Sequence, residues 1–228
     1  GTWSSEAGPY ILNEDKNIEI TGKLSEKATS GEYVLFAGRK YRVADKDSNG
    51  NTKLILDGYY EEGGNVYMMA YGSNNTFSTT TGIGQKLNGD VLNWLTNNND
   101  IEKEKLVTNY TWYQNEFASG DSYKISLEET NPTRSIQATV GLIRIGEMLS
   151  GQSSSILTNG YTAISSYNNA SAYWTMTSYT SSYAWSVRNS GDASGSVSGV
   201  GGLRAVIVVN SDVTITGGNG TWSSPYEI

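Results

Sequence analysis

The sequence predicts an α+β protein made of one domain: mostly antiparallel β-structure, with one or two short helices and long ordered loops. Its polar residues are mainly Ser, Thr, Asn, Gly and Tyr, and only 17% of the chain is charged, which is unlike a helical bundle or a disordered chain. Short alternating runs bounded by glycine indicate strands, and one stretch has helical spacing. A chain of 228 residues can bury a core without disulfides.

Charge and composition exclude several function classes. The net charge of −7 and a pI near 4.7 disfavour nucleic acid and anionic membrane surfaces as partners. The chain has no cysteine and no histidine, which removes thiol chemistry, disulfides and imidazole metal ligands. We expect no cofactor and no direct membrane contact. The chain begins at Gly1 inside a motif, so we expect a mature or trimmed fragment.

Three runs in the first part of the chain alternate as strands do. They are residues 18–21, 32–36 and 40–44, with Gly31 and Gly38 between them.

The next segment has two interpretations. Asp45, Asp47, Asn49 and Gly50 have the spacing that begins a calcium-binding loop, but the twelfth position is Leu56 instead of glutamate. Asn49-Gly50 also suits a hairpin turn, because both residue types tolerate positive φ. We favour the hairpin.

Helical spacing first becomes clear in residues 89–95, where Asp90 can cap a short helix that carries Trp94 inward. Residues 101–113 are interpreted as a second helix with its charges toward solvent. Residues 115–139 are polar and irregular, and residues 140–145 are expected to form a strand.

The stretch 172–209 combines scaffold and loop. Trp174 and Trp185 are expected in the core, since large aromatic residues dominate β cores. Arg204, at the start of the strand 204–207, and Arg188 are expected to anchor loops through carbonyls or a carboxylate. Residues 178–183 and 189–200 are expected to be displayed loops.

Recognition is assigned to polar and aromatic loop residues, because Tyr, Asn and Ser give contact area and hydrogen bonds at low entropic cost. Solvated loops have the same composition, which leaves a purely structural interpretation open. The candidate ligand-binding residues are Tyr161, Tyr167, Asn168, Asn169, Tyr179, Tyr183 and Asn189.

Catalysis by paired carboxylates, as in glycoside hydrolysis, is the enzyme alternative. No two of the available carboxylates have a recognisable catalytic context, so we expect no enzyme. These carboxylates are Asp121, Glu128, Glu129, Glu147 and Asp192.

The two ends of the chain carry related motifs. Residues 1–12, GTWSSEAGPYIL, recur in shortened form as residues 220–228, GTWSSPYEI. Either both ends are similar edge strands, with proline where no ladder hydrogen bond is needed, or the motif joins successive units by strand donation.

Several short motifs together resemble a known group of domains. They are the Gly-Leu-Ile-x-Ile-x-Glu segment at 141–147, Tyr-Trp-Thr-x-Thr at 173–177, Trp-Ser-Val at 185–187, Gly-Leu-Arg-Ala-Val-Ile at 202–207, residues 31–43 and Leu-Asn-Trp-Leu at 92–95. This pattern resembles Gram-positive bacterial surface and phage-associated domains whose core is similar to C-type lectin-like and formylglycine-generating-enzyme-like folds. The resemblance spans roughly residues 31–210.

The resemblance implies a ligand-binding or display scaffold at the cell surface. The enzyme branch of the group needs cysteines, and calcium-dependent lectins need Glu-Pro-Asn and Trp-Asn-Asp motifs; this chain has neither. We expect an extracellular, non-catalytic adhesion domain that binds a glycan or protein. The alternative is a subunit of a type IV pilus-like or other surface fibre that assembles head to tail through the GTWSS motifs.

Overall fold

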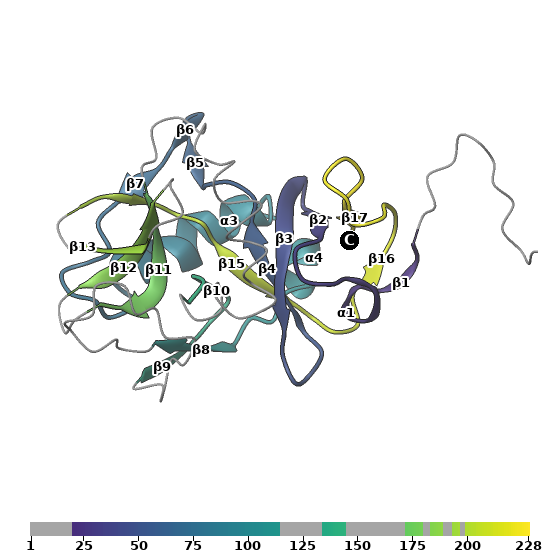
Figure 1. The fold of residues 1–228 in the computed structure, drawn as a ribbon, viewed down its shortest axis with the longest axis horizontal. Coiled ribbons are helices and arrows are strands. Elements are labelled where there is room, and N and C mark those ends of the chain that lie inside the picture. Colours follow the sequence, from purple (N-terminus) through teal and green to yellow (C-terminus); the bar gives the residue numbers. More distant parts are fainter. Residues whose placement is uncertain (1–19, 115–133, 145–171, 180–182, 189–192, 197–198) are drawn as a thin grey trace, which may run out of the picture.

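The computed structural model describes residues 20–114, 134–144, 172–179, 183–188, 193–196 and 199–228. Two mixed sheets dominate this part of the chain, which confirms the mostly β character (Figure 1). The larger sheet has the strand order β10-β15-β4-β3-β2-β17, and the smaller has β13-β12-β11-β14-β7.

The strands of the larger sheet are β2 (Tyr33–Phe36), β3 (Arg39–Lys46), β4 (Thr52–Leu56), β10 (Val140–Gly141), β15 (Val206–Val209) and β17 (Tyr226–Glu227). The smaller sheet contains β7 (Met68–Met69), β11 (Ala172–Ser178), β12 (Ala184–Arg188), β13 (Ala193–Ser196) and β14 (Gly201–Gly202). Paired short strands complete the β-structure: β1 (Gly22–Lys23) with β16 (Thr214–Ile215), β5 (Glu61–Glu62) with β6 (Asn65–Val66), and β8 (Tyr110–Gln114) with β9 (Arg134–Ala138).

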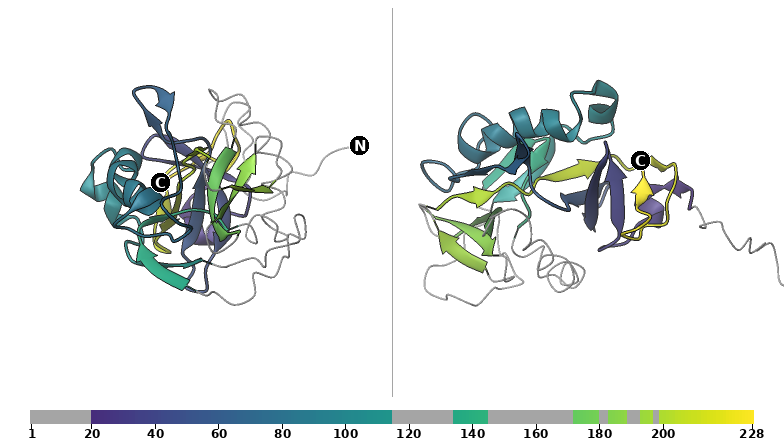
Figure 2. Two further views of the ribbon diagram at one scale, coloured as in Figure 1. Left: turned by 90° about the vertical axis from the view of Figure 1, so that its left-hand side faces the viewer. Right: turned by 90° about the horizontal axis from the view of Figure 1, so that it is seen from above.

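One helix of 14 residues lies along the sheets, as Figure 2 shows from above. It consists of α2 (Gly82–Lys86), a π-helical turn η1 (Leu87–Val91) and α3 (Leu92–Leu95). Ile83, Leu87, Val91 and Leu95 recur every four residues and are all buried, so one face of the helix packs into the core. The side chain of Asn88 ties this helix to β10 through the backbone of Val140.

The core forms where the alternating runs predicted it. Val34 and Phe36 of β2 and Tyr41 and Val43 of β3 are buried, whereas every residue of β4 is buried because the sheet is covered on both faces there. The strands predicted at 32–36 and 40–44 are therefore confirmed. Of the run 18–21, residues 18 and 19 lie outside the described residues, and residues 20 and 21 precede β1, which begins at Gly22.

The second predicted helix is wrong over most of its length. Only α4 (Asp100–Glu104) is helical, and the chain then turns into β8. Tyr110, Thr111 and Trp112 begin a β-branched and aromatic run with period-2 burial, and the Trp112 indole donates to the Ala138 carbonyl of β9. Pairing with a distant strand overrides the local helical pattern.

The strands expected at 140–145 and 204–207 also differ from the structure. β10 contains only Val140 and Gly141, and β15 begins at Val206. Arg204 precedes β15, and its guanidinium donates to the Leu56 carbonyl from Nε at 3.1 Å and from Nη2 at 2.8 Å. This contact confirms Arg204 as a structural anchor.

The hairpin interpretation of residues 45–56 is confirmed. β3 and β4 pair antiparallel, and Gly50 at the turn has φ +78°. The Asp47 carboxylate accepts hydrogen bonds from the backbone N–H groups of Asn49 and Asn51 and from the Asn51 side chain. Within the described residues, no cluster of three or more carboxylates could hold a metal ion.

Candidate functional site

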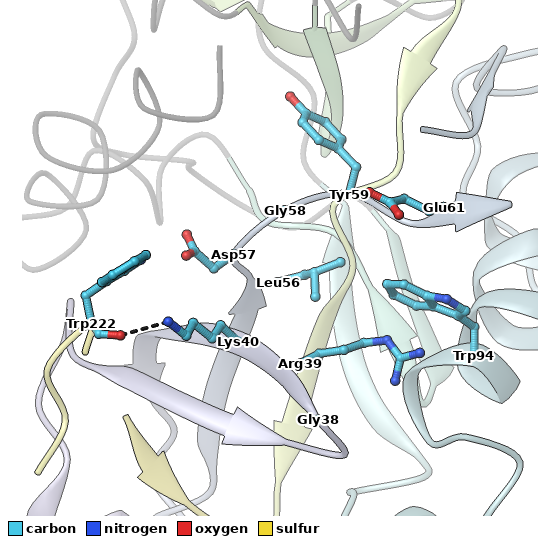
Figure 3. A pocket seen from close by; sticks show the side chains of 10 residues that line it. All are labelled: Gly38, Arg39, Lys40, Leu56, Asp57, Gly58, Tyr59, Glu61, Trp94 and Trp222. Carbon is cyan, nitrogen blue, oxygen red and sulfur yellow. Dashed lines mark hydrogen bonds between the residues drawn. The ribbon is translucent and has the colours of Figure 1, made fainter. Parts of the chain in front are cut away.

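A pocket of about 430 Å³ opens between segments that are far apart in the sequence (Figure 3). Such a volume is within the range of small-molecule binding sites. In this view, two tryptophans stand at opposite ends, two cations lie along one side and two carboxylates along the other. The lining residues are Gly38, Arg39, Lys40, Leu56, Asp57, Gly58, Tyr59, Glu61, Trp94 and Trp222.

The two-residue turn between β2 and β3 sets the cationic side. Ala37 and Gly38 have φ values of +49° and +78°, as a type I′ turn requires. The Ala37 carbonyl accepts hydrogen bonds from Arg39 Nη1 at 3.1 Å and from Asn97 Nδ2 at 3.0 Å, and Asn97 Oδ1 accepts from Arg39 at 2.8 Å. This closed network fixes the direction in which Arg39 leaves the turn.

Trp94 forms one end of the pocket. Its ring is partly buried and packs edge-on against Tyr60, with centroids 5.3 Å apart. The Arg39 guanidinium carbon lies 3.8 Å from the ring centroid, a cation–π contact. The helix is confirmed as the element that carries Trp94, and the indole lies at the edge of the core.

Trp222, from the C-terminal motif, forms the other end. It is 63% exposed, and Lys40 Nζ lies 3.9 Å from its ring centroid and donates to its carbonyl at 2.8 Å. The motif reaches this position because β17 pairs in parallel with β2 and Tyr226 is buried against Gly220. Gly220 has φ +79°, and a Cβ there would lie 2.6 Å from the Tyr226 ring.

The carboxylate side has free acceptors. The side chains of Asp57 and Glu61 are half-buried and receive no hydrogen bond from the described residues. Partial burial raises the pKa of Asp57 above its ordinary value, and the charges of Arg204, Arg42 and Lys40 offset part of that rise. Burial also raises the pKa of Tyr59.

Of the loop residues assigned to recognition, two lie in the described part of the chain. Tyr179 is partly buried against Trp185, with ring centroids 4.7 Å apart, and its ring is 6.4 Å from that of Tyr183, which is 43% exposed. They adjoin β11 and β12 and do not line the pocket. The other candidates, Tyr161, Tyr167, Asn168, Asn169 and Asn189, lie outside the described residues.

The predicted scaffold residues Trp174 and Trp185 are buried, which confirms their place in the core. The side chain of Arg188 lies outside the described residues, as do all five carboxylates of the enzyme alternative: Asp121, Glu128, Glu129, Glu147 and Asp192.

Sequence reasoning missed the pocket because its walls come from four separate segments. The one available signal was the tryptophan shared by both terminal motifs. The N-terminal copy, residues 1–12, lies outside the described residues.

Across the described segments, no helix is long and apolar enough to cross a membrane. Comparisons of the chain with protein-family models, with curated proteins and with solved structures give no match.

Proposed function

We propose that this protein is an extracellular, non-catalytic binding domain that recognises a carbohydrate in the pocket between Trp94 and Trp222. The observation that carries the proposal is the exposed indole of Trp222 in the same pocket as two carboxylates that accept no hydrogen bond from the described residues. A sugar ring has an apolar C–H face that packs on an indole and hydroxyls that donate to carboxylates. The pocket offers both kinds of contact at once.

The wider architecture of this proposal is C-type lectin-like. Its support is the motif pattern of residues 31–210, together with two mixed sheets and one longer helix. The Ser-, Asn- and Tyr-rich composition supports an extracellular location.

Glycan-array screening followed by calorimetry tests the function. Trp222→Ala is expected to abolish binding of any glycan that the parent protein binds. Tyr183→Ala is the matched control, since Tyr183 is also an exposed aromatic residue but lies outside the pocket. If Tyr183→Ala removes binding and Trp222→Ala does not, recognition belongs to the loops around Tyr179 and Tyr183.

A second candidate function is a subunit of a surface fibre that assembles head to tail. The repeated GTWSS motif favours it, because the C-terminal copy already adds an edge strand to the larger sheet. Light scattering after size-exclusion chromatography tests it: concentration-dependent polymers support the fibre, and a strict monomer with both ends intact excludes it.

A further inference from the structure

The pocket offers both acceptors and donors for hydrogen bonds. Asp57 and Glu61 have no hydrogen-bond partner among the described residues, so each leaves its carboxylate oxygens open to a ligand. Lys40 uses one of its three donors for the Trp222 carbonyl, and Arg39 donates to Ala37 and Asn97 from Nη1 alone. A ligand whose groups both donate and accept hydrogen bonds, as hydroxyls do, therefore fits this pocket.

The charges of the lining residues also restrict the ligand. The two cations, Arg39 and Lys40, balance the two carboxylates, so the lining has no net formal charge. The charges of Arg42 and Arg204 also act on Asp57. An ammonium group on a ligand would be attracted by the carboxylates but repelled by these cations. A hydroxyl group is uncharged, so its hydrogen bond to a carboxylate does not require a net charge in the pocket.

Asp57 is partly exposed and lines the pocket together with Gly58, which has no side chain. The exposed indole of Trp222 is at one end of the same pocket.

We propose that the pocket selects an uncharged saccharide, two of whose hydroxyls donate hydrogen bonds to Asp57 and Glu61 while its C–H face packs on Trp222. This inference rests on the proposed carbohydrate binding. It adds the charge class of the ligand and the two residues that bind its hydroxyls.

Calorimetry with three sets of probes tests the charge class. The probes are the methyl glycosides of glucose, galactose and mannose, their 2-amino-2-deoxy counterparts and the corresponding uronic acids. At least one neutral glycoside is expected to bind, and its charged counterparts to bind more weakly by about tenfold or more. Tighter binding of an amino sugar or a uronic acid overturns the inference.

Carboxamide variants test the two residues. Asp57→Asn and Glu61→Gln are each expected to weaken binding of the neutral glycoside by about tenfold, because a hydrogen bond to a charged acceptor is lost. Asp212→Asn, at an exposed position outside the pocket, is the control and should leave the Kd unchanged. Thermal unfolding verifies that each variant is folded. If Asp57→Asn does not fold, Glu61→Gln alone provides the test.

The outcomes separate this inference from the proposed function. If Trp222→Ala abolishes binding while both carboxamide variants bind like the parent, the pocket binds carbohydrate but the hydroxyl inference is wrong. If none of the probes binds, this inference is wrong. If Trp222→Ala has no effect on binding, or if the glycan array gives no ligand, both are wrong.

Discussion

The ammonium group of Lys40 lies against the indole of Trp222, with Nζ 3.9 Å from the ring centroid and 2.8 Å from the carbonyl oxygen of the same residue. Lys40 is on β3 and Trp222 belongs to the C-terminal motif, so one side chain links the sheet to the last segment of the chain. Each part of this link can be tested.

Lys40→Met removes the cation but keeps an unbranched side chain. We expect the free energy of unfolding to fall by about 0.5–1 kcal/mol, the usual contribution of an exposed cation–π contact. Chemical denaturation measures the change. Lys23→Met is the control, since Lys23 is exposed and has no partner among the described residues; equal effects of the two variants would contradict the link.

Gly220→Ala should detach the C-terminal motif. Alanine is strained at φ +79°, and its Cβ would overlap the buried Tyr226 ring, so we expect destabilisation of about 3 kcal/mol. Amide hydrogen exchange at Glu227 and Ile228 should also be faster in this variant than in the parent protein. Gly63→Ala is the matched control: its φ is +61° but its Cβ would meet no atom within 4 Å, so only about 1 kcal/mol is expected.

Asp57→Asn should stabilise the protein at neutral pH. Because partial burial raises the pKa of Asp57 in the folded state, ionisation of this group disfavours folding as pH rises through that pKa. The advantage of the variant should vanish below the ordinary aspartate pKa, where the carboxyl is protonated in both states. Chemical denaturation at neutral and acidic pH measures the stability difference between the variant and the parent, with Asp212→Asn as the control. A difference that does not change with pH would contradict the raised pKa of Asp57.

Arg204→Lys should destabilise the protein by about 2 kcal/mol although it keeps the charge. Arg204 is 1% exposed and donates twice to the Leu56 carbonyl, a geometry that a lysine ammonium does not reproduce. Thermal and chemical unfolding measure the loss, and an unchanged midpoint would show that the paired hydrogen bonds contribute little.

Asp47→Ala should lower the free energy of unfolding by about 1–2 kcal/mol, because the turn loses an acceptor for two backbone N–H groups. We expect the same loss with calcium and with a chelator. Calorimetric titration completes the test: micromolar calcium binding that disappears in Asp45→Ala would favour the calcium interpretation instead.

The 14-residue helix shows where the sequence was informative and where it was not. Its second half was predicted from 89–95, but its first turns were not, since Gly82 and Gly84 are weak helix formers. Tertiary contact explains Gly84, because a Cβ there would lie 2.3 Å from the Ser78 carbonyl oxygen. Gly84 is therefore required in the helix by a tertiary contact, which the spacing of residues along the sequence does not predict.

The sequence by itself determined the features that depend on near neighbours: the alternating strands β2 and β3, the Asn49-Gly50 hairpin, the burial of Trp174 and Trp185, and the relation between the two ends of the chain. Only the tertiary structure decided the pocket. Lys40 and Trp222 are 182 positions apart, and they meet because β17 pairs in parallel with β2 at the edge of the larger sheet. Side-chain periodicity fixes which face a residue occupies, whereas strand order fixes which residues share a site.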